Sequence, residues 1–367
     1  MNTRGGVYPR RDKPGGSSSN GHRSNTMHLL ALVKSADHVC CRYRLAAFRS
    51  YLADAGHELE LRAWPRSWFG RLFLHRHLRR ADVVIVQRRL LAPWEVLLVR
   101  RSAKRLVFDF DDAVFMRSSN TKSSLVSSVR QHGFARTVRA ADLIIAGNEF
   151  LGNQAAAQIT AARLRVVPTC VDTDLYPLAS HRQTANGIRL VWIGSSSTLK
   201  GLERVRDLWE IIGRHCPGVS LKLICDRPMT LDHLPIEFRP WSSATEGAEL
   251  AEADIGISWL PDDSWSRGKC GLKVLQYMAA GLPVIANPVG VQTEMVRHGE
   301  TGFLAETPEE WCEAVNQLAA DPALRRRMGQ EGRRIVESEY SVAAGAARWV
   351  AALDQLAQTP AAEEVPA

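Results

Sequence analysis

The sequence predicts an α/β fold in which parallel sheets are covered by helices. Short, unbroken apolar runs alternate along the chain with longer segments of helical periodicity. Apolar runs without polar alternation indicate strands that are buried on both faces, as in a parallel sheet. The pattern starts again after a polar segment at 176–187, and 367 residues are too many for one ordinary core. We therefore predict two doubly wound domains whose facing sheet ends form a ligand-binding cleft.

The elements are predicted in the following order. The first domain supplies the strands MHLLALVK, ADVVIVQ, KRLVFDF, ADLIIAG and RLRVVP, and the second supplies IRLVWIG, VSLKLIC, ADIGISWL and LPVIAN. Helices are expected between them. The first 26 residues are rich in Gly, Ser and Arg, which is typical of disorder. The predicted units are a disordered tail over 1–26, a first domain over 27–182, a second domain over 183–340, a C-terminal helix over 341–357 that packs back on the first domain, and a disordered tail over 358–367.

Composition excludes several classes of protein. Hydrophobic residues make up 45% of the chain and charged residues 23%, which are ordinary globular values. No apolar run approaches the roughly 18 residues of a membrane span, and the N-terminus lacks the apolar core of a signal peptide. Seven cysteines, without paired metal-ligand spacing, favour reduced thiols over disulfides or a zinc site. We therefore predict a cytoplasmic protein.

Positive charge is concentrated in the first half of the chain. Residues 1–180 hold 28 Lys and Arg against 14 Asp and Glu, whereas residues 181–367 hold 19 against 25. A basic half indicates an anionic partner, which could be a nucleic acid, a membrane surface or a phosphorylated acceptor. The segment RSWFGRLFLHRHLRR (66–80) has the composition of a helix at an anionic membrane surface, although such a stripe is more often a sheet-covering helix with a solvated basic face. Nucleic acid is disfavoured because the Arg residues elsewhere lack interleaved base-stacking aromatics.

The segment VFDFDDAVF (107–115) places three carboxylates at the end of a predicted strand. It resembles the opening motif of the haloacid-dehalogenase-like phosphatases. In that family, however, the motif follows the first strand, whereas here it follows roughly the third, and Ala113 replaces the usual Thr or Val. Carboxyl ends of strands face the cleft in such sheets, so Asp111 and Asp112 are predicted to lie there. The alternative is that Asp109 caps a helix or turn and the other two are solvated.

Two segments of the second half have the features of a phosphate site. In IGSSSTLKG (193–201), Gly194 and Ser195 end a predicted strand and Lys200 lies on the helix that follows, so N–H groups and a cation converge. In GKCGLKVLQYMAAGLP (268–283), Gly271 permits close backbone approach before a helix that carries Lys273. An ordinary turn with a solvated Lys is the alternative at each position. Two such turns together favour an anionic ligand.

Three segments, in this order and spacing, resemble the retaining nucleotide-sugar glycosyltransferases of family 4: VVPTCVDTDLYP, VWIGSSSTLKGLE and the stretch 267–305. The resemblance extends from residue 27 to about 356 and is strongest in the second half. It implies the GT-B fold of two Rossmann-like domains and a hexosyl-type transfer, with retention, from a nucleoside diphosphate sugar to a glycan or lipid-linked acceptor. The second domain would bind the nucleotide sugar and the first the acceptor. No metal and no cofactor beyond the nucleotide sugar co-substrate is implied.

The resemblance also implies roles for donor-site residues. Lys200 matches the diphosphate-binding Lys of the family, although Ser195 stands where many members carry Arg. Lys273 would neutralise the departing nucleoside diphosphate. The two Glu residues that bracket the family motif are replaced here by Gly268 and Gln276. Gln276 would then accept hydrogen bonds from the ribose hydroxyls.

Recognition of the transferred sugar would shift to Lys269 or to backbone amides. On the acceptor side, Asp111 and Asp112 would lie beside the reacting sugar and orient the acceptor hydroxyl. Arg42 and Arg44 directly follow the first predicted strand at a predicted helix start, which suits an anion, with a surface charge pair as the alternative. A nucleotide-sugar epimerase and a catalytically silent binding protein of the same fold are the alternative functions, because the Glu pair is missing.

Overall fold

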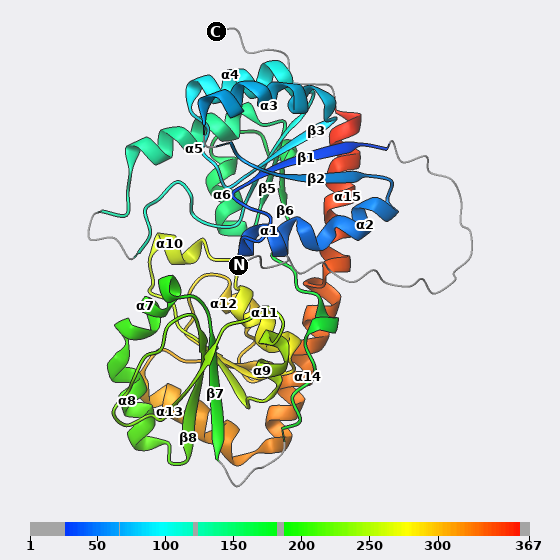
Figure 1. Cartoon of the computed structure of the whole chain (residues 1–367). Helices are drawn as coiled ribbons and strands as arrows, with labels where there is room; N and C mark the ends of the chain where they lie inside the picture. The colour runs from blue at the N-terminus through cyan, green and yellow to red at the C-terminus, as the bar shows by residue number, and fades with distance from the viewer. Residues whose placement is uncertain (1–25, 66, 120–123, 182–186, 360–367) are drawn as a thin grey trace, which may run out of the picture.

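Two α/β domains, each built on a six-stranded parallel sheet, make up the protein (Figure 1). The structure is a computed structural model and describes residues 26–65, 67–119, 124–181 and 187–359. The sheet orders are β2-β1-β3-β4-β5-β6 and β12-β11-β10-β7-β8-β9, and neighbouring strands pair in parallel throughout. The prediction of two doubly wound domains is confirmed.

The strands and helices have the following bounds. The first sheet contains β1 (His28–Val33), β2 (Glu58–Ala63), β3 (Val83–Gln87), β4 (Leu106–Phe110), β5 (Leu143–Ala146) and β6 (Leu164–Val166). The second contains β7 (Ile188–Ile193), β8 (Val219–Cys225), β9 (Ile236–Pro240), β10 (Ile255–Ser258), β11 (Val284–Ala286) and β12 (Gly302–Leu304). The helices of the first domain are α1 (Val39–Arg44), α2 (Arg49–Asp54), α3 (Trp68–Arg80), α4 (Pro93–Ser102), α5 (Ser128–Ala140) and α6 (Glu149–Ala156). The remaining helices are α7 (Ser196–Arg204), α8 (Arg206–His215), α9 (Glu246–Ala251), α10 (Ser264–Arg267), α11 (Leu272–Ala279), α12 (Gln292–Met295), α13 (Pro308–Ala320), α14 (Pro322–Glu339) and α15 (Val342–Gln358).

Three of the twelve strands, β2, β9 and β12, were missing from the sequence prediction. All three lie at the edges of their sheets. Residues of β2 and β9 are mostly half-buried or exposed, and β12 has only three residues. An edge strand needs no continuous apolar run, so the signal that identified the inner strands is absent there.

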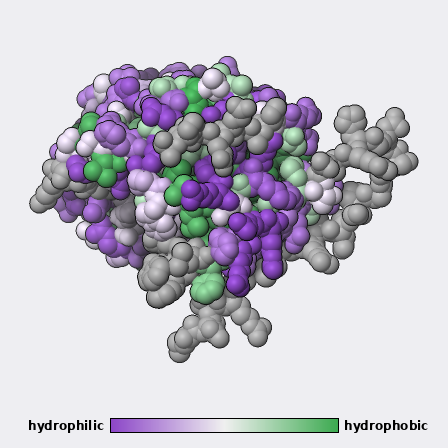
Figure 2. Space-filling view, turned by 90° about the horizontal axis from the view of Figure 1, so that it is seen from above, coloured by the Kyte–Doolittle hydropathy of each residue, from purple (hydrophilic) through white to green (hydrophobic). Residues whose placement is uncertain are grey.

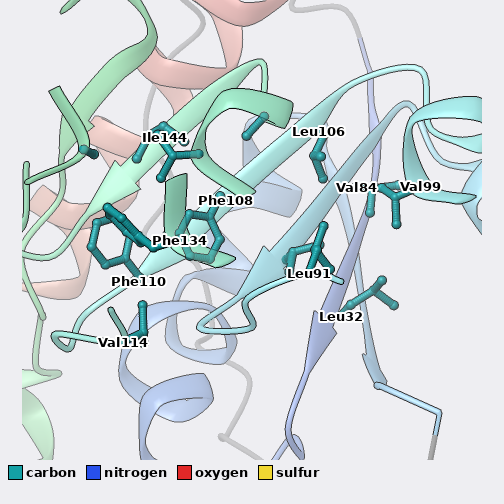
Figure 3. Close-up of a cluster of buried hydrophobic side chains, with 14 of the residues drawn as sticks. Leu32, Val84, Leu91, Val99, Leu106, Phe108, Phe110, Val114, Phe134 and Ile144 are labelled. Atoms are coloured by element: carbon teal, nitrogen blue, oxygen red, sulfur yellow. The ribbon is translucent and has the colours of Figure 1, made fainter. Parts of the chain in front are cut away.

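The first sheet buries alternate residues of each strand on opposite faces. Val84, Val86 and Phe108 face a core formed with α3, α4, α5 and α6, which Figure 3 shows. Within it the rings of Phe108 and Phe110 stack at 5.1 Å between centroids, with Phe134 of α5 set against them at an angle. Residues between them, such as Ile85 and Val107, face the second core with α1, α2 and α15.

The chain passes between the domains twice at adjacent points. After β6 it enters the second domain, and after α14 it returns as α15, whose Trp349 and Leu353 lie in the core of the first domain. At the return, Val171 N donates to Tyr340 O at 2.9 Å and Val342 N donates to Val171 O at 3.2 Å. The predicted tails and the predicted boundary near residue 182 lie mostly outside the described residues.

Within the described parts of the chain, none of the helices combines the length and apolarity needed to cross a membrane.

Candidate active site

Loops at the carboxyl ends of the strands bring residues of both domains together. In a parallel sheet these loops meet along one edge, and that edge of each sheet faces the other domain. The residues in question are Arg88 after β3, Asp111 and Asp112 after β4, Asn148 after β5 and Gly194 after β7.

Arg88, Asp111, Asp112 and Lys269 form an ion network across the domain interface. Nε of Arg88 lies 3.3 Å from Oδ1 of Asp111, and Nη2 of Arg88 pairs with Asp112. From the second domain, Nζ of Lys269 lies 3.0 and 3.2 Å from the two carboxylate oxygens of Asp112. Arg88 has a φ of 56°, a left-handed conformation that is uncommon outside Gly and that tends to occur at functional sites. Asp112 therefore lies between a cation of each domain, and Asp111 pairs with Arg88 of its own domain.

The segment 268–271 of the second domain is docked into the first domain. Cys270 belongs to the apolar core of the first domain, and its Sγ lies 3.4 Å from the carbonyl oxygen of Asp111. Nδ2 of Asn148 donates to the carbonyl oxygen of Lys269 at 3.0 Å. Lys269 is thus held at both its backbone and its side chain by the first domain.

Gly268 is required by this docking. A Cβ placed on Gly268 would lie 2.8 Å from Cβ of Ala113 and 3.0 Å from its backbone nitrogen. Such distances are too short for any side chain without movement of the first domain. The closed interface therefore explains why Glu is absent from this position.

Lys273 is a half-buried cation on α11 and lies beside the end of β7. Its Nζ lies 5.0 Å from the centroid of the Trp192 ring. A Cβ on Gly194 would lie 2.5 Å from Cη2 of Trp192 and 3.0 Å from Cε of Lys273, so only Gly leaves room for this arrangement. Burial, together with the positive charge of Lys269, lowers the pKa of Lys273 to about 8. In the described part of the chain no carboxylate lies within ion-pair distance of Lys273.

The start of α7 carries the other predicted phosphate ligands. Ser195 is the N-cap residue, and Lys200 is exposed on the helix. The side chain of Asp226, which follows β8, accepts hydrogen bonds from the backbone N–H of Ser196 and, at 2.8 Å, from its hydroxyl. These hydrogen bonds lower the pKa of Asp226. A carboxylate of the protein therefore already occupies part of the helix end that the sequence predicted for phosphate.

Gln276 lies in a buried hydrogen-bonded cluster. Its Nε2 donates to the hydroxyls of Tyr176 at 3.1 Å and Tyr43 at 3.3 Å, and Gln276 is only 4% exposed. The Tyr43 hydroxyl donates to Oε1 of Glu246 at 2.8 Å, and Arg42 lies 3.7 Å from the same oxygen. These contacts engage only the amide nitrogen, so the acceptance of ribose hydrogen bonds by the Gln276 side-chain oxygen stays a prediction. Arg42 lies at the domain interface and faces a carboxylate.

Arg44 and Asp109 form a buried ion pair. Nε and Nη2 of Arg44 lie 3.1 and 2.5 Å from Oδ1 of Asp109, and Nη1 donates to the carbonyl oxygen of Val167 at 2.8 Å. Nε2 of Gln87 donates to the other carboxylate oxygen at 3.0 Å. Two predictions are therefore wrong: Arg44 is neither a surface charge nor open to an anion, and Asp109 caps no helix. Both side chains are completely buried.

The residues that the structure describes contain no group of three or more His, Cys, Asp and Glu side chains that could hold a metal ion. The absence of a metal from the reaction stays a prediction.

Comparison with known sequences points to glycosyltransferases. A family profile described as "Glycosyl transferases group 1" matches residues 260–335. The chain is 36% identical over 157 residues to N-acetyl-alpha-D-glucosaminyl L-malate synthase of Bacillus anthracis, covering 39% of this chain and 40% of that protein. It is 30% identical over 172 residues to a GDP-Man:Man(3)GlcNAc(2)-PP-Dol alpha-1,2-mannosyltransferase of Dictyostelium discoideum, covering 45% and 30%.

A third relative matches over more of the chain. It is a GDP-mannose-dependent alpha-(1-6)-phosphatidylinositol monomannoside mannosyltransferase of Mycobacterium tuberculosis, 26% identical over 262 residues, or 67% of this chain and 63% of that protein. The chain thus spans between 30% and 63% of the length of these three relatives.

Solved structures match over nearly the whole chain. Sucrose-phosphate synthase from Thermosynechococcus elongatus superposes with a TM-score of 0.69 at 16% identity, over 91% of this chain and 99% of that one. Anabaena Alr3699/HepE in complex with UDP and glucose superposes with a TM-score of 0.65 at 17% identity, over 89% and 99%. These structures are GT-B glycosyltransferases. The chain has the GT-B fold.

Several residues at the interface of this GT-B protein were not identified from the sequence. Arg88 directly follows β3. Asp111 was predicted to face the cleft because it follows the carboxyl end of a strand, and the same reasoning applies to Arg88. No sequence pattern marks Glu246 as an interface residue, because its partner Tyr43 is 203 positions away. Asn148 looks like an ordinary N-cap residue, since Oδ1 accepts from Leu151 N, and only the structure shows its second contact with Lys269.

We expect Asp109→Asn to lower the free energy of unfolding by about 3–5 kcal/mol, because it leaves the Arg44 charge buried without its partner. Asp111→Asn is the matched control, since it makes the same change two residues further along; we expect it to cost about 1 kcal/mol. Urea denaturation of both variants gives the comparison. Equal losses would contradict the structural role of Asp109.

The low pKa of Lys273 predicts that affinity for a nucleoside diphosphate falls as pH rises. The free protein holds this cation below about pH 8 and loses it above, while the phosphates titrate lower, at about pH 6. The measurement is calorimetric titration with UDP and GDP between about pH 7 and about pH 9.5, roughly one unit on either side of the deprotonation of Lys273. Binding should be weaker on the alkaline side. Lys273→Met should bind weakly at every pH in this range. A variant with the same pH dependence as the wild type would exclude Lys273 as the titrating group.

Proposed function

We propose that the protein is a retaining glycosyltransferase of family 4 that transfers a hexose from a nucleoside diphosphate sugar to a glycan or lipid-linked acceptor. The observation that carries this proposal is the half-buried Lys273, which lies beside Gly194 without a carboxylate partner among the described residues. Such a cation is suited to a diphosphate whose charge grows as the sugar departs. Lys269 lies close enough to lower the pKa of Lys273 and also contacts Asp112.

In the proposed reaction, each domain contributes one half of the chemistry. Lys273 and Lys200 stabilise the leaving nucleoside diphosphate. A phosphate oxygen of that leaving group takes the proton of the acceptor hydroxyl, so no enzyme base is needed. Asp111 and Asp112 hold the acceptor so that this hydroxyl faces the departing phosphate. Lys269 and the backbone amides of the segment 268–271 contact the sugar.

The names of the relatives support sugar transfer from a nucleotide. Two of the three reported relatives are GDP-mannose-dependent or GDP-Man mannosyltransferases by name, and HepE was solved with UDP and glucose. Transfer is thus favoured over epimerisation or silent binding. Because the names include both GDP and UDP, the nucleobase has to be found by experiment.

We further propose that the protein works in the cytoplasm at an anionic membrane surface. All seven cysteines are free thiols, which fits a reducing compartment. The basic first domain supports contact with anionic lipid, and the mannosyltransferase of M. tuberculosis is named for a phosphatidylinositol-linked substrate.

The decisive experiment combines donor binding with turnover. A panel of UDP- and GDP-sugars should contain one donor that binds and is slowly hydrolysed. Lys200→Ala and Lys273→Ala should each weaken its binding by about 10- to 100-fold, the loss expected for a hydrogen bond to a charged group. Asp111→Asn should lower kcat with little change in donor affinity. If both Lys variants bind and turn over the donor as the wild type does, the donor site is wrongly placed.

A chelator should leave the activity on this donor largely unchanged, because lysines rather than a metal ion are proposed to neutralise the diphosphate. The measurement compares initial rates in EDTA, in Mg²⁺ and in Mn²⁺. Activity that disappears with EDTA and returns with either metal would refute this part of the mechanism.

A further inference from the structure

Three neighbouring helices on one face of the first domain are almost free of acidic residues. α3, α4 and α5 pack side by side over the same face of the sheet. Their sequences contain nine Arg and a single acidic residue, Glu95. Glu95 is buried and pairs with Arg89, so it does not offset the charge outside. This face is therefore strongly cationic.

The outward side of α3 and α4 carries the same pattern twice. On α3, Phe73, Arg76 and Arg80 follow one another at steps of three and four; on α4, Trp94, Leu97 and Arg101 do the same. Steps of three and four place residues on one stripe of a helix. All six residues are exposed, and the apolar ones are 61% (Phe73), 47% (Trp94) and 50% (Leu97) exposed.

The apolar residues lie at the cleft end of these helices. Both helices follow a strand, so they begin at the edge of the sheet from which Asp111 and Asp112 extend. α4 begins five residues after Arg88, a member of the ion network at the interface. Phe73 and Trp94 thus belong to the half of each helix nearer the candidate site, and Arg80 and Arg101 to the far half.

The apolar area is small and set among charges. Figure 2, viewed from the end of the first domain, shows separate apolar patches among strongly hydrophilic surface. The guanidinium of Arg76 lies 5.9 Å from the centroid of the Phe73 ring. Exposed aromatic and aliphatic side chains interspersed with Arg suit the headgroup region of a bilayer, where rings enter the interface and guanidinium groups meet phosphates.

We propose that the α3–α4 face, defined as Phe73, Arg76, Arg80, Trp94, Leu97 and Arg101, docks on a bilayer that contains anionic phospholipids. This inference extends the proposed function, because docking would turn the cleft end of the first domain toward the lipid. The acceptor of the candidate site would then be lipid-linked. A continuous run of Arg without exposed apolar residues would instead suit a nucleic acid.

The test is co-sedimentation of the full chain with vesicles of phosphatidylcholine alone and of phosphatidylcholine mixed with phosphatidylglycerol. The wild type should bind only the mixed vesicles, and less so in high salt. Arg76→Glu combined with Arg101→Glu should weaken binding by about tenfold or more, since each basic residue near the surface contributes substantially. The control is Arg326→Glu with Arg327→Glu, which makes the same change of charge at exposed positions of α14 in the second domain and should bind like the wild type.

A second variant separates lipid docking from general attraction to anions. Phe73→Ser with Leu97→Ser keeps every charge, and it should bind mixed vesicles more weakly while its weak attraction to a duplex DNA probe is unchanged. Binding to mixed vesicles that neither variant weakens, or tighter binding to the DNA than to vesicles, would overturn the proposal. Vesicle binding is measured without donor, and donor binding is measured without vesicles. A chain that does not bind vesicles would therefore refute membrane docking but not sugar transfer, and a chain that does not bind a donor would refute sugar transfer but not membrane docking.

Discussion

The buried ion pair between Arg44 and Asp109 holds together the part of the molecule on which the interface depends. Asp109 lies on β4, the strand from which Asp111 and Asp112 extend. Arg44 ends α1, whose preceding residues Arg42 and Tyr43 reach the second domain. Taking two charges into the core is costly unless they are paired, so the two elements are fixed relative to each other. The Arg44–Asp109 pair thereby fixes β4 and α1, which lead to two of the contacts between the first domain and the second.

The second domain contributes to the candidate site mainly through one short segment. Lys269 is bound by its side chain to Asp112 and by its carbonyl oxygen to Asn148, and Cys270 lies in the core of the first domain. Four residues further on, Lys273 responds electrostatically to Lys269. Asp112 and Lys273 are therefore linked through neighbouring residues of a single loop and helix start. The position of the domains relative to each other and the charge of the site are linked.

The inner strands and the two-domain organisation could be predicted because each depends on local patterns. An unbroken apolar run such as Val83–Gln87 identifies a strand by itself. The edge strand Glu58–Ala63 is mostly half-buried or exposed and carries no such run. Side-chain partners could not be predicted, since Asp109 meets Arg44 across 65 positions and Gln276 meets Tyr43 across 233. The sequence places a carboxylate at a strand end, but only the folded chain decides whether that end turns toward the core or the cleft.

The return of α15 to the first domain has a consequence for the order in which the domains form. Trp349, Leu353 and Leu356 cover one face of the first sheet, yet they follow the whole second domain along the chain. During synthesis, the face that carries Ile85 and Val107 is covered only in part, by α1 and α2, while all strands of the second sheet leave the ribosome. Domains of a nascent chain usually fold in the order in which they are made. Here the second domain can complete its core before the first, and the last helix then joins both into one unit.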